Sequence, residues 1–240
     1  AAEGIPVLGY DRPIEDDRAF YLTFDNKEVG RVIARSILAE VPNGNYAIIK
    51  GDKGDPNALF LLEGMMDVIG DAVAAGDVTI VGEAFTDGWK PDNAQKNMEQ
   101  ILTANNNNVD AVLSENDGMA GGAIAALEAQ GLAIPVSGQD GDHAALNRVA
   151  RGTQLVSVWK DARQLGAAAG NIAAALASGV SMSDIDGSVK WSGGAKGVEM
   201  DAIFLAPTPI SASNIDVVID AGHIAKDKVC AGAVAGVSGC

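Results

Sequence analysis

The regular alternation of short apolar segments with longer amphipathic segments constrains the fold of this chain more than any other feature. The short segments are apolar on both faces, which is typical of parallel strands covered by helices on both sides. They are residues 5–9, 20–24, 46–49, 78–82, 109–113, 133–137 and 154–158. The segments with helical periodicity are residues 26–40, 57–75, 92–105, 118–130, 142–151 and 161–178. This alternation predicts an α/β fold with a doubly wound parallel sheet.

The pattern changes after Gly179. Residues 181–209 are rich in glycine and proline and contain two short strand-like runs, 188–191 and 201–205. An apolar run at 215–219 and a tail with two cysteines follow. We interpret this region as crossovers and edge strands rather than as another strand–helix unit.

Composition excludes several classes of protein. The 240 residues include 17 Lys and Arg against 32 Asp and Glu, a net charge of −15, and phosphate binding needs clustered cations. A nucleic-acid partner is therefore not expected. No apolar stretch reaches the roughly 18 residues of a spanning helix, so we predict no transmembrane segment. Two cysteines are too few for a disulfide-built fold or a Cys-rich metal site.

The sequence lacks the motifs of the common catalytic and cofactor sites. It has no Gly-rich dinucleotide or P-loop motif and no nucleophile elbow. His143 and His223 are the only histidines, and no cysteine accompanies them. The Asp-rich turns at 52–55 and 140–142 do not fit a calcium loop. We therefore predict no catalytic residue, no metal and no cofactor.

Polar and aromatic side chains follow the predicted strands, where open parallel sheets bind their ligands. The set comprises Asp11, Arg12, Asp52, Asp55, Asn57, Trp89, Glu115, Asn116, Asp117, Gln139, Asp140, Trp159 and Lys160. Carboxylates and amides bridge neighbouring hydroxyls, and a Trp face packs on the C–H face of a sugar ring. Carboxylates at least match the cations, which disfavours an anionic ligand. The inventory predicts a small, neutral, polyhydroxylated ligand.

Each of these residues also has a purely structural interpretation. Asp, Asn and Gly after a strand commonly form turns and cap helices. Asn57 is a candidate N-cap of helix 57–75, and Asp140 or Asp142 of helix 142–151. Trp89 is a candidate cover for an edge of the core, Lys160 a candidate solvated residue, and Trp159 a candidate core or hinge residue.

Several longer motifs resemble a known family. They are Gly-Tyr-Asp-Arg at 9–12, Phe-Asp-Asn at 24–26, Asp-Gly-Trp-Lys-Pro-Asp-Asn-Ala at 87–94, Leu-Thr-Ala-Asn-Asn-Asn at 102–107, Glu-Asn-Asp-Gly-Met-Ala-Gly-Gly-Ala-Ile at 115–124, Ser-Gly-Gln-Asp at 137–140 and Ser-Val-Trp-Lys at 157–160. Together they resemble the periplasmic sugar-binding proteins of ABC transporters. They point to the xylose branch more than to ribose, arabinose or galactose binders.

The resemblance implies two α/β lobes joined by three crossovers that close on one monosaccharide, most specifically D-xylose. It implies sugar contacts from Asp11, Arg12, Asp55, Asn57, Trp89, Asn116, Asp140 and Lys160, with Trp89 stacking on the ring. It also implies a non-enzymatic, extracytoplasmic protein, in the periplasm or tethered to the cell surface, that delivers sugar to a membrane permease.

The resemblance implies the following division of the chain. Residues 1–10 are a remnant of the N-terminal lobe, 11–160 a complete C-terminal lobe, 161–192 a segment returning to the N-terminal lobe, 193–212 an edge strand and crossover of the C-terminal lobe, and 213–240 a final crossover and tail. The family has a complete lobe before the Tyr-Asp-Arg strand. We therefore expect an N-terminally truncated chain, without a signal peptide, that binds sugar weakly.

Three points stay open at this level. Other monosaccharides are alternatives to D-xylose, and the effector domain of a LacI-like repressor shares the expected fold, although no basic helix-turn-helix is present. An enzyme would need a nucleophile or a metal. Cys230 and Cys240 either form a disulfide, as suits an extracytoplasmic protein, or are two unrelated thiols.

Overall fold

The computed structural model describes residues 4–240 and divides into two compact units. The smaller unit contains the chain up to Asn26 together with Lys160–Pro207, and the larger unit contains Lys27–Trp159 and Thr208–Cys240. Residues 1–3, the start of the predicted segment 1–10, lie outside the described residues.

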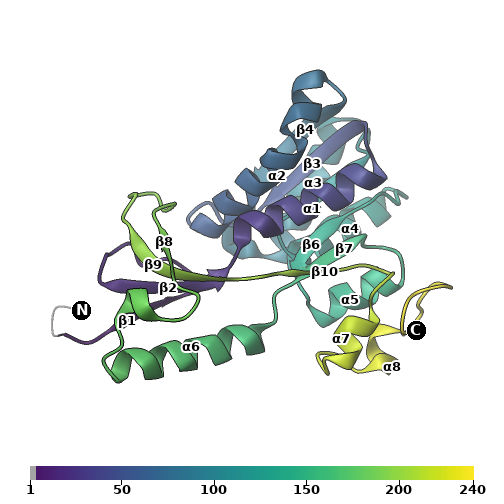
Figure 1. The fold of residues 1–240 in the computed structure, drawn as a ribbon. Coiled ribbons are helices and arrows are strands. Elements are labelled where there is room, and N and C mark those ends of the chain that lie inside the picture. Colours follow the sequence, from purple (N-terminus) through teal and green to yellow (C-terminus); the bar gives the residue numbers. More distant parts are fainter. Residues whose placement is uncertain (1–3) are drawn as a thin grey trace. The chain divides into compact units, whose positions relative to one another are not determined.

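A mostly parallel sheet forms the centre of the larger unit (Figure 1). Its strands are β3 (Gly44–Lys50), β4 (Val78–Phe85), β5 (Ala111–Ser114), β6 (Ser137–Asp140), β7 (Val156–Trp159) and β10 (Thr208–Ile210). Strand β3 pairs in parallel with β4 and β5, β6 pairs in parallel with β7, and β10 pairs antiparallel with β7. A bridge between Val112 and Val136 joins the two groups, so β5 lies at the middle of the sheet.

Helices cover both faces of this sheet, as its strands with two apolar faces require. They are α1 (Asn26–Glu40), α2 (Pro56–Ala75), α3 (Pro91–Ala104), α4 (Asp117–Ala129) and α5 (His143–Ala150). Ile48 and Leu113 pack in one cluster with apolar residues of α1 and α2, and Ile49 and Val112 pack in another with those of α3 and α4. The prediction of a doubly wound α/β fold is confirmed.

The smaller unit is a four-stranded sheet with one long helix. Its strands are β1 (Val7–Tyr10), β2 (Ala19–Phe24), β8 (Val189–Trp191) and β9 (Met200–Leu205), in the order β1-β2-β9-β8. Helix α6 (Ala162–Ala177) packs on one face through Leu165, Ile172 and Leu176. On the other face Tyr21 packs against Trp191 and Phe204.

The structure differs from the sequence-based expectations in three places. Strand β6 covers Ser137–Asp140 rather than residues 133–137, so Asp140 ends the strand instead of following it. The apolar run at 215–219 belongs to a short helix, α7 (Asp216–Asp220). Residues 11–26 and 193–207 lie in the smaller unit because β2 pairs with both β1 and β9.

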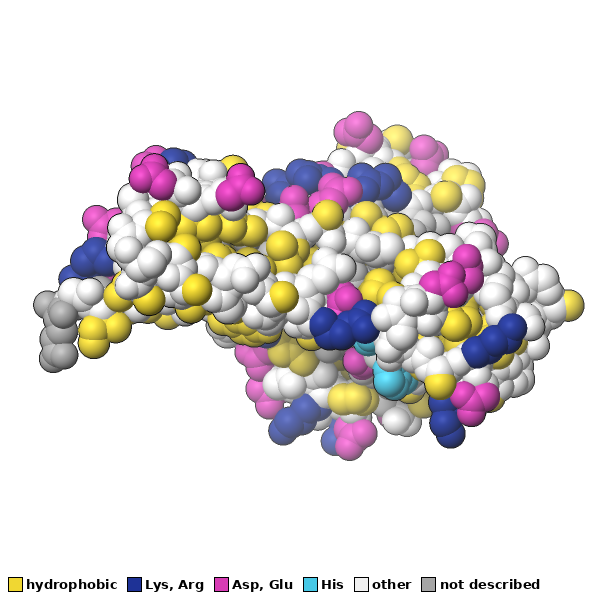
Figure 2. All heavy atoms as spheres, turned by 60° about the horizontal axis from the view of Figure 1, so that its bottom comes forward, with side chains coloured by type: hydrophobic (Ala, Val, Ile, Leu, Met, Phe, Trp, Pro, Cys, Tyr) yellow, Lys and Arg dark blue, Asp and Glu magenta, His cyan; other side chains and the backbone are white. Residues whose placement is uncertain are grey.

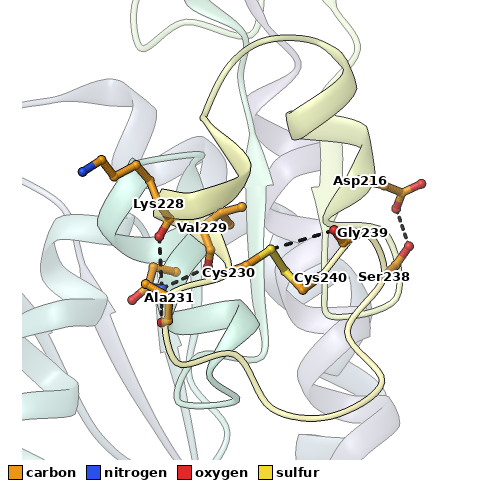
Figure 3. Close-up of a disulfide and its surroundings, with 9 residues drawn as sticks. Asp216, Lys228, Val229, Cys230, Ala231, Ser238, Gly239 and Cys240 are labelled. Atoms are coloured by element: carbon orange, nitrogen blue, oxygen red, sulfur yellow. Dashed lines mark hydrogen bonds between the residues drawn. A yellow bond between two sulfur atoms is a disulfide. The ribbon is translucent and has the colours of Figure 1, made fainter.

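The C-terminal segment packs on the larger unit and is closed by a disulfide (Figure 3). It holds α7 and α8 (Lys226–Val229), whose apolar side chains join Trp159 and Ile210 in one cluster. Cys230 and Cys240, ten residues apart, are bonded to each other. Closing a loop of this length stabilises the folded state by about 2–3 kcal/mol in the chain-entropy model.

Within residues 4–240, no helix combines the length and the apolar composition that crossing a membrane requires. On the face drawn in Figure 2, Lys and Arg side chains stand singly or in small groups among Asp and Glu, without a continuous basic patch.

Candidate functional site

The carboxyl ends of the parallel strands bring five of the eight predicted ligand residues to one edge of the larger unit. Because β3 to β7 run in parallel, the residues that end or follow them meet at the same edge of the sheet. These residues are Asp55, Asn57, Trp89, Asn116 and Asp140. They belong to the ends of four different strands: Asp55 and Asn57 follow β3, Trp89 follows β4, Asn116 follows β5 and Asp140 ends β6.

The Trp89 indole is held in a defined place at this edge. Its ring lies directly over the backbone of Gly51, where a Cβ atom would overlap the ring. Its Nε1 donates to Oδ2 of Asp55 at 3.2 Å. The short helix η1 (Asp87–Trp89) presents the ring, and the Gly88 N–H at its middle donates to Asp52 Oδ2 at 2.6 Å. Trp89 is partly exposed and also packs against both core clusters, so the structural interpretation of this residue holds in part.

Asp55 performs two tasks at the start of α2. Its Oδ1 accepts the N–H of Asn57 at 3.0 Å, which makes Asp55, and not Asn57, the N-cap of the helix. Its other oxygen orients Trp89. Asn57 lies in the first turn with only 3% of its surface exposed.

Asn116 follows the central strand β5 and caps α4. Its Oδ1 accepts the N–H of Met119 at 2.8 Å. The residue is partly exposed, and an Asn side chain that caps a helix through its Oδ1 still has an NH₂ group with two donors.

Asp140 ends β6 with an uncommon backbone conformation, φ 110°. Of the five non-glycine residues with positive φ in the described chain, three are predicted ligands, namely Asp11, Trp89 and Asp140. Such conformations cost free energy and persist where the surroundings fix them, and they cluster at functional sites. The backbone therefore marks three of the positions that the strand-end argument selected.

Two carboxyl groups next to Asn116, those of Glu115 and Asp117, are fully buried; the sequence placed both among the strand-end residues but not among the eight predicted ligands. Glu115 accepts the Gly51 N–H, and burial raises its pKa well above the usual value. Asp117 accepts four hydrogen bonds, and burial raises its pKa to about 7. A charged residue directly after a buried strand was the available indication, but the sequence does not say which way its side chain turns.

The other three predicted ligands belong to the smaller unit. Asp11 follows β1, has φ 64°, forms an ion pair with Arg12 and accepts from Thr23 Oγ1 at 3.4 Å. Its own N–H donates to the Leu22 carbonyl at 2.8 Å. Lys160 follows β7 and is partly exposed. Trp159, just before it, is 5% exposed within the C-terminal cluster, which agrees with its interpretation as a core residue.

Residues 4–240 contain no group of three or more His, Cys, Asp or Glu side chains arranged to hold a metal ion. The two histidines contact each other through His143 Nε2 and the His223 carbonyl, at 2.9 Å.

Comparison with known proteins gives a consistent family assignment. Residues 1–181 match the model of the periplasmic binding protein domain. The chain is 47% identical over 180 residues to the D-xylose-binding periplasmic protein of Escherichia coli, covering 74% of this chain and 54% of that protein. It is 41% identical over 231 residues to the D-xylose-binding periplasmic protein of Haemophilus influenzae, covering 95% and 68%.

Solved structures agree. An ABC transporter solute-binding protein from Clostridium phytofermentans with bound β-D-glucose has a TM-score of 0.83 and 29% identity, covering 95% of this chain and 76% of that chain. A carbohydrate transporter solute-binding protein from Chloroflexus aurantiacus, in complex with D-glucose, has a TM-score of 0.85 at 24% identity, covering 95% and 75%, and supports the fold alone.

These relatives are binding proteins and not enzymes, which confirms the prediction of a non-enzymatic protein. On the family match and the identity to both D-xylose-binding relatives, the chain belongs to the family of periplasmic binding protein domains.

Proposed function

We propose that this chain binds a monosaccharide, most specifically D-xylose, at the carboxyl edge of the larger unit. The observation that carries the proposal is the fixed indole of Trp89, backed by Gly51 and oriented by Asp55, at an edge lined with carboxylate and amide groups. A flat ring of this kind packs on the C–H face of a pyranose, and the polar groups bond its hydroxyls.

Each predicted ligand has a chemical role in this proposal. Asp55 and Asp140 accept hydrogen bonds from sugar hydroxyls, and Asn57 and Asn116 donate as well as accept. Asp11, Arg12 and Lys160 of the smaller unit are further proposed ligands, since guanidinium and ammonium groups donate to hydroxyl oxygens. No cofactor or metal takes part.

The wider role that we propose is that of the substrate-binding subunit of an ABC importer. The subunit works outside the cytoplasm, in the periplasm or tethered to the cell surface, and delivers its sugar to a membrane permease. The names of the Escherichia coli and Haemophilus influenzae relatives support this role. In the same proposal the larger unit corresponds to a complete lobe of the family and the smaller unit to part of the other.

Another monosaccharide is the second candidate, because a related solved structure holds β-D-glucose. A LacI-like repressor domain has less support. The net charge of −15 disfavours binding to DNA, which requires clustered Lys and Arg, and the face drawn in Figure 2 has no continuous basic patch.

Isothermal titration calorimetry of the chain with D-xylose tests the proposed ligand. We expect a saturable, one-to-one binding heat with D-xylose, a weaker response with D-glucose, and none with L-xylose. The enantiomer is the matched control because it has the same composition and the wrong placement of every hydroxyl. A higher affinity for D-glucose than for D-xylose would identify D-glucose as the better ligand. The absence of a saturable heat with any of these sugars would refute monosaccharide binding.

A further inference from the structure

Three consecutive residues after the central strand connect the two sides of the candidate site. Asn116 is the proposed ligand, and the buried carboxyl groups of Glu115 and Asp117 flank it. In the sheet order, β3 lies on one side of β5, and β6 and β7 lie on the other. Glu115 bonds the segment after β3, whereas Asp117 bonds the segment after β6 and a side chain on β7.

Glu115 acts on the Trp89 side. Its Oε2 accepts the Gly51 N–H at 2.6 Å, and Gly51 is the residue on whose backbone the Trp89 ring rests. The Gly51 carbonyl in turn accepts the N–H of Thr86, at the end of β4 from which the Trp89 turn starts. Glu115 therefore holds in place the Gly51 backbone, against which the Trp89 ring packs.

Asp117 acts on the Asp140 side. Its Oδ2 accepts the N–H groups of Gly141 and Asp142, both at 3.0 Å, and the Ser157 hydroxyl at 2.6 Å. Its Oδ1 accepts Gln154 Nε2 at 2.8 Å. Since Asp140 precedes two of these bonded amides, Asp117 holds the turn that keeps Asp140 at its positive φ.

We propose that Glu115 and Asp117 are positioning residues of the sugar site, which tie the Trp89 side and the Asp140 side to the central Asn116 and so set the spacing of the ligand groups. This inference rests on the proposed function. Neither carboxyl group touches the sugar, since both are fully buried.

The two carboxyl groups differ in the protonation that their contacts require. Glu115 accepts the Gly51 N–H through its Oε2, and its Oε1 lies buried without a hydrogen-bond partner, which suits a neutral acid. Lys50 and Asp55 are the charged groups that act on it. Asp117 has four donors around two oxygens, which suits the ionised form.

The charged groups facing Asp117 come from two elements. Asp140 ends β6 and Asp142 lies on the turn after it, and the Arg148 guanidinium of α5 donates to the Asp117 carbonyl at 2.7 Å. His223 of the C-terminal segment reaches the same turn through the Gly141 carbonyl, at 2.8 Å. Burial raises the pKa of Asp117 to about 7, so its ionised fraction changes in the neutral range.

The test compares three variants with wild type by D-xylose titration and by amide hydrogen exchange. Asp117→Asn removes one carboxylate oxygen, and we expect it to weaken binding by about 10- to 100-fold, the range seen when the hydrogen-bond partners that orient metal ligands are replaced. Exchange at Gly141 and Asp142 should become faster. Glu115→Ala should weaken D-xylose binding and speed amide exchange at Gly51. Glu115→Gln resembles the neutral acid, and its affinity for D-xylose should stay within about threefold of that of wild type.

The pH profile separates positioning from a merely structural role. Wild-type binding should strengthen as the pH rises through about 7, where Asp117 ionises, and this dependence should be absent in Asp117→Asn.

The contribution of Asp117 to the free energy of unfolding changes with pH in the opposite direction. Because the folded pKa is raised, the contribution of Asp117 to stability is present below its ordinary value of 3.8 and is lost as the pH rises through about 7.

Asp110→Asn is the matched control. Asp110 precedes the same strand and accepts the Asn45 N–H at 2.7 Å, at the opposite end of the sheet from the site. This variant should keep wild-type affinity and the wild-type pH profile. Wild type that binds no sugar would refute the proposed function, while the exchange data would still test the positioning. Variants with wild-type affinity and unchanged exchange at Gly51, Gly141 and Asp142 would overturn the inference.

Discussion

Replacement of Trp89 by alanine is expected to weaken D-xylose binding by about 2–4 kcal/mol, the range of a buried aromatic anchor. This corresponds to roughly 30- to 700-fold in affinity. The indole supplies the flat apolar surface of the site, and its orientation is fixed by Asp55 Oδ2 at 3.2 Å. Titration calorimetry measures the change, and circular dichroism checks that the variant is folded.

Two further variants make this prediction specific to the placement of the ring. Gly51→Ala leaves Trp89 present but puts a methyl group where the ring now lies, so it should also weaken binding strongly. Trp89→Phe keeps an aromatic face and loses the bond to Asp55, and its loss should be smaller than that of Trp89→Ala. If Trp89→Ala bound D-xylose as tightly as wild type, the proposed stacking would be wrong.

The second large effect concerns the stability of the larger unit. Helices α1 and α2 approach so closely at Gly30 and Gly64 that a Cβ atom at Gly64 would overlap the backbone oxygen of Lys27. Backbone atoms cannot move aside as the end of a flexible side chain can. Gly64→Ala is therefore expected to lower the free energy of unfolding by about 3 kcal/mol, at the upper end of the usual cost of overpacking.

Gly70→Ala is the matched control, because Gly70 lies in the same helix and a Cβ atom there meets open space. This change should raise the free energy of unfolding by about 0.4–1 kcal/mol, because alanine lowers the conformational entropy of the unfolded chain. Urea unfolding followed by circular dichroism measures both variants. Equal stability of Gly64→Ala and wild type would contradict the close helix contact.

The periodicity of the sequence predicted the helices well where one face was strongly apolar. Helix 26–40 has the observed bounds, and helix 161–178 differs from α6 by one residue at each end. Strand β6 was misplaced because its observed residues, Ser-Gly-Gln-Asp, carry no apolar pattern. Their burial comes from packing between β5 and β7, which a local pattern cannot report.

For the candidate site, too, the sequence predicted some features and not others. Parallel strands place their carboxyl ends at one edge, so the polar residues that follow them could be selected from sequence. The direction of each side chain could not. Glu115, Asn116 and Asp117 are adjacent in sequence, yet only Asn116 is partly exposed while its two neighbours are buried. Their hydrogen-bond partners lie 24 to 64 residues away along the chain, as for Gly141 and Gly51, and depend on the tertiary fold.

The assignment of residues 11–26 also required tertiary information. Strand β2 is buried along its whole length and pairs with β9, about 180 residues later in the chain (Tyr21 opposite Ala202). A buried strand in a sequence fits any parallel sheet. Its partner is decided by packing, here of Tyr21 against Trp191 and Phe204.

A two-dimensional ¹H–¹⁵N NMR titration of the chain with D-xylose tests most directly whether the sugar binds at the carboxyl edge of the larger unit. We expect saturable shifts of the Trp89 indole N–H, assigned with Trp89→Phe, and of the Gly51, Asn116 and Gly141 amides at the carboxyl edge of the sheet. The chemical shift of the Asn45 amide, at the opposite end of the sheet, should not change. Saturable shifts confined to other regions, or no shift of Trp89 while D-xylose binds, would show that the sugar does not bind at this edge.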